Sequence, residues 1–416
     1  MLTKLRNSLL ARNTLWMLLG NGARSIIQAA YFIVIARSLG ADGYGAFVGT
    51  AALVGILATF GSLGYDNLLV KNVSRNPELF ERYWGNAVVM ILFSGSLLVG
   101  VAMLLSHYFL PNTISPLLVF SIAVADILFA RISETSERAF QAFERMGWSA
   151  RLAILLQLSK LIAALGLVLL AASPTPEQWG LLYLLSGILS ASIGFLITRR
   201  KLGAPRTDLA RAASELKEGF YFSVGFASYK IYNDIDKTML ARLSTLEAAG
   251  IYGAAYRLIE VSFTPVISLM YATYTRFFQH GSGGIRGSLS YAKRLLPYAG
   301  AYGLLTGVAL YLFAPLLPYL LGSDYQNAVE AVRWLAIIPC LMAIRLLVSD
   351  ALTGAGFQGL RSAVQVFVAL FNVLLNLLLI PTYAWRGAAW ASVISDSFLL
   401  ISLLVVVWYV RREEQA

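Results

Sequence analysis

The sequence predicts an all-α membrane protein with twelve transmembrane helices, arranged as two parallel six-helix repeats around a central cleft. Twelve stretches of about 20 mostly apolar residues follow one another along the 416 residues, and a bilayer core about 30 Å thick needs roughly 20 helical residues to cross it. The composition agrees, with 58% hydrophobic and 13% charged residues. Lys and Arg gather in alternate gaps between the stretches. Together these observations exclude a soluble fold.

Helices are expected rather than strands, because lipid cannot satisfy backbone polar groups and the apolar stretches lack the alternation of a barrel wall. The predicted spans are 14–36, 46–70, 83–105, 117–139, 149–171, 179–198, 218–241, 251–275, 291–314, 329–351, 360–380 and 387–410.

The basic residues orient these helices. One alternating set of segments carries 23 Lys and Arg, namely Lys4, Arg6, Arg12, Lys71, Arg75, Arg82, Arg131, Arg138, Arg145, Arg151, Arg199, Arg200, Lys201, Arg206, Arg211, Lys217, Arg276, Arg286, Lys293, Arg294, Arg361, Arg411 and Arg412. The opposite set carries four, Arg37, Arg242, Arg333 and Arg386. Because cytoplasmic loops are enriched in Lys and Arg, we expect both termini in the cytoplasm. The net charge of +11 then reflects topology and contact with anionic lipid rather than nucleic-acid binding.

Two short echoes indicate an internal repeat. Tyr-Gly-Ala occurs at 44–46 and again at 252–254, each time between a first and a second helix of one half. Ala139–Phe143 and Gly356–Leu360 match in the same way after spans four and ten. We therefore expect an N-terminal lobe at 1–198, a basic cytoplasmic linker at 199–217 and a C-terminal lobe at 218–416. Because each lobe has an even number of helices, the repeats would be parallel. Duplication without transport is the alternative.

Charged residues within the spans are the main functional signal, since each costs about 2.5–3.5 kcal/mol at a helix centre on insertion scales and therefore faces protein or water. Six cations remain after the loop residues are removed: Arg24, Lys160, Lys230, Lys237, Arg257 and Arg345. The acids are Asp126, Asp234, Asp236, Glu260 and Asp396. Neither Arg24 nor Lys160 has an acid one turn away, which favours a role in binding an anion.

Helical spacing adds neighbours to these cations. Gln28 lies one turn from Arg24, and Gln157 lies beside Lys160. Lys230 differs from these two cations, because Asp234 is one turn away and could neutralise it. The predicted substrate-binding set is Arg24, Lys160, Lys230, Arg257, Arg345, Gln28 and Gln157. Guanidinium groups bind phosphate oxygens bidentately, whereas ammonium groups act as point charges. Structural ion pairs between helices are the alternative, and we expect Arg257 to pair with Glu260.

The buried acids suggest ion coupling. Asp126 and Asp396 are single acids in otherwise apolar helices, and an intramembrane carboxylate can exchange a proton or hold a cation. Asp126, Glu260 and Asp396 are the candidates for this role. Pairing with one of the cations above is an equally good interpretation of Asp126 and Asp396.

Three segments resemble those of a known family: Ala36-Arg37-x-Leu39-Gly40-x-x-x-Tyr44-Gly45, Asn233–Lys237 and Ile251–Arg257. Over its whole length the chain resembles the polysaccharide-export branch of the multidrug/oligosaccharidyl-lipid/polysaccharide exporter superfamily, the flippases of O-antigen and exopolysaccharide repeat units. The resemblance implies transfer of a polyprenyl-diphosphate-linked oligosaccharide from the cytoplasmic to the outer leaflet of the bacterial inner membrane by alternating access. Its implied partners are membrane lipids and, among proteins, a glycan polymerase and glycosyltransferases.

Three other functions stay open from the sequence. Drug antiporters of the same superfamily also have twelve spans and would use the acids. Lipid II flippases usually carry two further helices, which this sequence lacks. A membrane scaffold for glycan synthases would tolerate neutral residues at every mid-span cation.

Enzymatic and cofactor-dependent functions are not expected. A single cysteine, Cys340, and two scattered histidines provide no metal site. The sequence has no Gly-rich loop followed by Lys-Ser or Lys-Thr, so ATP hydrolysis within this chain would not drive transport. We expect no cofactor, no metal and no nucleic-acid partner.

Overall fold

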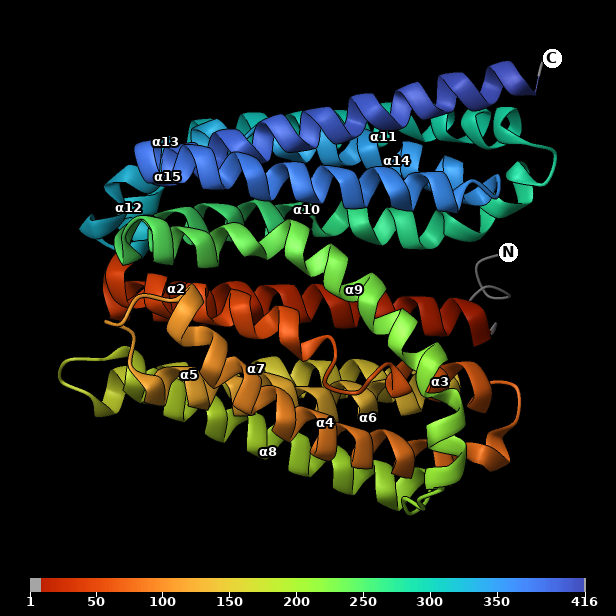
Figure 1. Ribbon diagram of the computed structural model, residues 1–416, viewed down its shortest axis with the longest axis horizontal. Coiled ribbons are helices and arrows are strands. Elements are labelled where there is room, and N and C mark those ends of the chain that lie inside the picture. The colour runs from red at the N-terminus through yellow and green to blue at the C-terminus, as the bar shows by residue number, and fades with distance from the viewer. Residues whose placement is uncertain (1–8, 415–416) are drawn as a thin grey trace. The chain divides into compact units, whose positions relative to one another are not determined.

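The computed structural model describes residues 9–414, and every regular element within that range is a helix (Figure 1). Two basic residues used above for orientation, Lys4 and Arg6, lie outside the described residues. The cytoplasmic location of both termini stays a prediction. The all-α class is confirmed.

The chain divides into two compact units, unit 1 up to Arg242 and unit 2 from Leu243 onward. Unit 1 contains α2 (Leu9–Ala58), α3 (Tyr65–Val73), η1 (Pro77–Leu79), α4 (Phe80–Phe109), α5 (Pro116–Ala123), η2 (Val124–Ala130), α6 (Arg131–Ala142), α7 (Met146–Leu170), α8 (Pro176–Leu202) and α9 (Leu209–Leu243). Unit 2 contains α10 (Leu246–Gly281), α11 (Ile285–Phe313), η3 (Ala314–Leu316), α12 (Leu317–Leu321), η4 (Ser323–Tyr325), α13 (Gln326–Leu335), α14 (Ile338–Gly354) and α15 (Gln358–Glu413).

Within the described range, seven helices are long and apolar enough to cross a membrane, or eight if the bent pair of α13 and α14 is one span. Two of the seven, α2 and α15, are each two helical arms joined at a non-helical residue, Gly40 (φ 67°) and Ala384 (φ 50°). A multi-pass membrane protein is therefore shown. The count of twelve spans in two repeats stays a prediction.

Two predicted spans are broken in the structure. The span 46–70 stops at Ala58, turns through Gly64 and resumes as the short helix α3. Gly64 has a positive φ of 76°, and a Cβ atom there would lie 2.0 Å from the backbone oxygen of Gly219. The span 329–351 bends by 40° between α13 and α14, and Pro339 in the first turn of α14 fits that boundary.

The predicted linker 199–217 is mostly helical, because α8 extends to Leu202 and α9 begins at Leu209. The first part of α9 is bonded to the rest of unit 1. Asn86 on α4 exchanges two hydrogen bonds with the backbone of Asp208, at 3.1 and 2.8 Å. The Tyr83 hydroxyl donates to Glu215 at 2.7 Å, and Tyr65 donates to the backbone oxygen of Ala212. These contacts hold the first part of α9 on unit 1, and the two compact units divide between Arg242 and Leu243.

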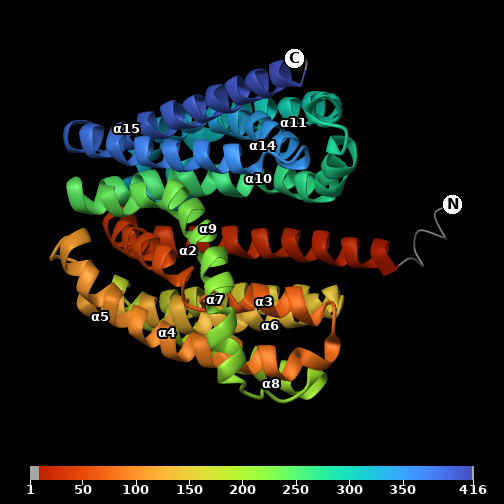
Figure 2. The same ribbon diagram turned by 45° about the vertical axis from the view of Figure 1, so that its right-hand side comes forward.

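The far end of α9 also packs on unit 1. Thr238 donates a hydrogen bond to the backbone oxygen of Gly49 at 3.0 Å, and Gly49 lies against Ala241. Figure 2 shows α9 running obliquely across the other helices of unit 1. The helix is therefore held near both ends, with its middle segment over the region described next.

Candidate functional site

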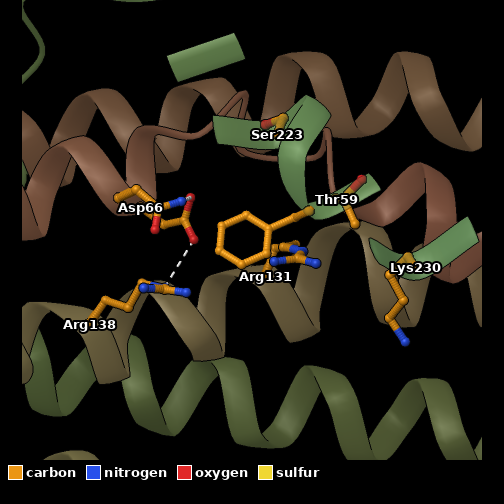
Figure 3. A pocket seen from close by; sticks show the side chains of 8 residues that line it. Thr59, Asp66, Arg131, Arg138, Ser223 and Lys230 are labelled. Carbon is orange, nitrogen blue, oxygen red and sulfur yellow. Dashed lines mark hydrogen bonds and ion pairs between the residues drawn. The ribbon is translucent and has the colours of Figure 1, made fainter. Parts of the chain in front are cut away.

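A cavity of about 200 Å³ lies inside unit 1, between the end of α2, α3, α6 and α9 (Figure 3). Three cations line it, two from α6 and one from α9. The complete lining is Thr59, Asp66, Asn67, Arg131, Arg138, Ser223, Phe226 and Lys230. Among these described residues Asp66 is the one acid, so the wall of the cavity carries more positive than negative charge.

The local sequence of α6 explains two of the cations. Arg131 and Arg138 are seven residues apart, so both lie on one face of the helix. The segment between them is rich in Ser, Thr and Glu. Ser133 lies 3.3 Å from Ser190 on α8, and Thr135 donates to the Arg131 backbone oxygen. A polar helix thus continues directly from the apolar run of α5 and η2.

Arg138 holds a buried carboxylate. Its Nε atom lies 3.1 Å from Oδ2 of Asp66, whose side chain is 6% exposed. Asp66 also accepts hydrogen bonds at Oδ1 from the Ser62 hydroxyl at 2.7 Å and the Asn67 amide at 3.4 Å. The pair connects α3 to α6 across the cavity, as the dashed line in Figure 3 shows.

Two further polar groups at the cavity are buried without a hydrogen-bond partner, the Nε of Arg131 and the Oγ of Ser223. The Nη1 of Arg131 is engaged by Glu134 on the next turn, at 2.8 Å. Ser223 is 1% exposed. Buried polar groups are nearly always hydrogen-bonded, so these two groups can each bond to a polar ligand or to water in the cavity.

Lys230 is the predicted substrate-binding residue that lines this cavity. Its Nζ atom lies 2.7 Å from Oδ2 of Asp234, as the one-turn spacing suggested. Lys237 binds the other oxygen of the same carboxylate. The Lys230 side chain is 45% exposed.

Lys160 lies in a second cluster of unit 1. Its Nζ is 2.6 Å from the Tyr183 hydroxyl, which donates at 2.8 Å to Oδ1 of Asp126. The Lys160 and Asp126 charges are themselves 3.9 Å apart. Asp126 is on η2, a π-helical turn, and such turns are frequent at functional sites. Lys160 therefore has an acid partner on another helix, which helical spacing could not reveal.

The remaining candidates of unit 1 are Gln157, Arg24 and Gln28. Gln157 is 4% exposed, and its Oε1 has no hydrogen-bond partner. Arg24 and Gln28 on α2 are half-buried. The guanidinium of Arg24 interacts electrostatically with the buried Glu137 of α6.

Unit 2 contains the last four candidates as two ion pairs. Arg257 Nη1 lies 2.7 Å from Glu260 Oε2, which confirms the predicted local pair. Arg345 Nη1 on α14 lies 3.3 Å from Asp396 Oδ1 on α15. Both members of the second pair are buried, with side chains 9% and 4% exposed. Asp126, Glu260 and Asp396 each have a basic partner.

Sequence reasoning missed the cavity residues Arg131, Arg138 and Asp66. The two arginines were interpreted as orientation signals, because they fall at the basic end of a predicted span. Their seven-residue spacing on a Ser- and Thr-rich helix was the available signal. The sequence does not predict the contact between Asp66 and Arg138, because that contact depends on how α3 packs against α6.

The fold is similar to that of membrane transporters of known structure. One solved structure with the same fold is an inward-facing multidrug resistance MATE family transporter of the MOP superfamily, with a TM-score of 0.74, 14% identity and 94% of each chain covered. Another is the lipid II flippase MurJ in an inward closed conformation, with a TM-score of 0.74, 12% identity, and 95% of this chain and 87% of that chain covered.

By its sequence the chain belongs to the family described as "Polysaccharide biosynthesis protein", which matches residues 10–278. This membership confirms the resemblance seen in the sequence. A similar curated protein is the "Probable low-salt glycan biosynthesis flippase Agl15" of Haloferax volcanii. It is 22% identical over 397 residues, covering 93% of this chain and 81% of that protein.

Proposed function

We propose that this protein is a flippase that moves a polyprenyl-diphosphate-linked oligosaccharide from the cytoplasmic to the outer leaflet by alternating access. The observation that carries the proposal is the cavity of unit 1, whose described lining contains three cations, Arg131, Arg138 and Lys230, and one acid, Asp66. Family membership and the glycan biosynthesis flippase among its relatives support the same conclusion. The transported glycan lipid is the substrate, and the protein itself catalyses no covalent reaction.

The diphosphate is the part of such a substrate that the cavity suits. Arginine presents a planar fork of donors to phosphate oxygens, and these charge-assisted bonds are stronger than neutral ones. A cavity of about 200 Å³ is smaller than the roughly 300–1,000 Å³ of drug-sized ligand pockets. It would therefore hold the charged headgroup and leave the sugars and the lipid tail outside.

The drug antiporter alternative has less support. It rests on acids that could bind a coupling ion, yet Asp126, Glu260 and Asp396 each lie against a basic side chain. If it held, cells without the protein would become sensitive to cationic dyes. A glycan flippase would leave that sensitivity unchanged.

Loss of the cavity arginines tests the proposal. In a strain that lacks the chromosomal gene, the Arg131→Gln/Arg138→Gln double variant should restore at least tenfold less surface glycan than the wild-type chain. Arg75→Gln is the matched control, because Arg75 is exposed and its loss removes the same kind of charge. Membrane protein levels are compared by immunoblot. Normal glycan in the double variant at normal protein level would refute the proposal.

A further inference from the structure

Asp66 is an acid in a cavity whose other charged lining residues are all cations. It is located in the first turn of α3, and its side chain is 6% exposed. The acids that engage the other two cations, Glu134 and Asp234, are not among the residues that line the cavity. Of the described lining residues, Asp66 alone presents a carboxylate to the interior.

The neighbours of Asp66 hold it in this position. Ser62 and Asn67 donate to one carboxylate oxygen, and the other oxygen faces Arg138 at 3.1 Å. In Figure 3 Arg138 approaches Asp66 from the opposite wall, and Lys230 lies at the other end of the cavity. The Asp66 carboxylate contacts the Nε of Arg138, a donor that a phosphate oxygen of a ligand would also bind.

Asp66 leaves other donors of the cavity unused. The Arg131 Nε and the Ser223 Oγ are buried and without hydrogen-bond partners. A diphosphate has several oxygens on two linked groups, so it could bind these donors and Arg138 together. A single carboxylate fixed to α3 contacts Arg138 and does not satisfy either of the other two.

We propose that Asp66 is an internal competitor of the diphosphate headgroup for Arg138. This inference rests on the proposed function and concerns regulation at the same site. With the cavity empty, Asp66 neutralises Arg138; when a diphosphate enters, Arg138 turns to it and the two anions repel. The competition weakens binding, which serves release, because a transported ligand must bind well enough to enter and weakly enough to leave.

Titration of the purified protein with inorganic pyrophosphate, followed calorimetrically in detergent, tests the inference. Asp66→Asn should bind pyrophosphate at least tenfold more tightly than the wild type, which corresponds to about 1.4 kcal/mol. Asp42→Asn is the matched control, because Asp42 is an exposed acid of unit 1. Equal or weaker binding by Asp66→Asn, or an equal gain in both variants, would overturn the inference.

A second variant covers the case in which Asp66→Asn does not fold. Arg131→Gln leaves the Asp66–Arg138 pair in place and should lower pyrophosphate affinity about tenfold, or about 1.4 kcal/mol. Unchanged affinity would show that the cavity is not the diphosphate site.

Polyprenyl diphosphate should displace pyrophosphate from the wild type. Displacement by phosphatidylglycerol alone would instead assign the site to a membrane lipid and overturn the inference.

The two proposals can fail separately. If the arginine double variant loses surface glycan while Asp66→Asn binds pyrophosphate as the wild type does, only the role of Asp66 is wrong. If Asp66→Asn binds more tightly and the double variant still makes normal glycan, the site binds diphosphate but the flippase assignment is wrong.

Discussion

Each unit buries a basic residue against an acid on another helix, but the two units do so differently. In unit 1, Lys160 and Asp126 are 3.9 Å apart, and the Tyr183 hydroxyl lies between them with bonds of 2.6 and 2.8 Å. In unit 2, Arg345 contacts Asp396 directly at 3.3 Å. The first arrangement is a relay through a hydroxyl group, and the second is a direct contact between two charges.

The surroundings differ as well. Aromatic rings enclose the cluster of unit 1: Lys160 lies 4.2 Å from the centre of the Tyr183 ring, which itself packs on Phe47 and Trp179. In unit 2, Ser395, the chain neighbour of Asp396, accepts a hydrogen bond from Asn372 at 3.1 Å, and Asn372 accepts one from Asn376 at 3.0 Å. The acid is 19% exposed in unit 1 and 4% in unit 2. The acid of unit 1 is therefore the more exposed of the two, and the protein encloses the acid of unit 2 almost completely.

The largest effect is expected in the pair of unit 2. Arg345→Met removes the basic side chain that lies 3.3 Å from the buried Asp396, and breaking a buried pair in this way typically lowers the free energy of unfolding by about 3–5 kcal/mol. Thermal or denaturant unfolding of the purified protein measures the loss. The Arg345→Met/Asp396→Leu double variant should recover most of it, because no unpaired charge remains. If Arg345→Met were as stable as the wild type, the buried pair would not contribute to the stability of unit 2.

A smaller loss is expected in unit 1. Lys160→Met should lower the free energy of unfolding by about 1–3 kcal/mol, the usual cost of leaving a buried polar group unsatisfied. The loss should be smaller than in unit 2 because Asp126 keeps its hydrogen bond from Tyr183. The same unfolding measurement applies. Glu330→Gln is the control, since it breaks an exposed pair with Arg386 and should leave the unfolding temperature unchanged. A loss as large as that of Arg345→Met would remove the distinction between the units.

The smallest effect should follow from the relay itself. Tyr183→Phe keeps the ring and removes the hydroxyl group, so it should cost about 0.5–1.5 kcal/mol, the net value of a typical hydrogen bond. If the relay serves transport, surface glycan should fall further than this stability loss explains. Comparing glycan with the amount of folded protein in membranes separates the two effects. Glycan that falls only in proportion to folded protein would leave the relay a structural role.

Hydropathy predicted most of the helices, because a run of apolar residues long enough to cross a bilayer has few other stable conformations. It could not predict the break after Ala58, where the chain turns through Gly64 so that two backbones approach closely. It also could not predict that α9 packs with unit 1. That packing depends on contacts such as Tyr83 with Glu215, which are distant in the sequence.

The candidate site was predictable where interactions are local. Arg257 and Glu260 are three residues apart, and their pairing follows from helix geometry. Lys160 and Asp126, like Arg345 and Asp396, meet only because separate helices pack together. Arg131 and Arg138 were visible as charges, but their place at the end of a span suggested topology alone. Only the packing of α3, α6 and α9 shows that they line a cavity.

The attachment of α9 to unit 1 has a consequence for dividing the chain. The duplicated sequence suggests cutting between the halves at 203–208, the one non-helical stretch of the predicted linker. That cut would separate α9 from Tyr65 and Tyr83, and its fragments would lose the contacts that anchor this helix. A split protein made as 1–242 and 243–416 would instead leave each compact unit whole, so co-expressed pieces should complement a deletion best when severed after Arg242.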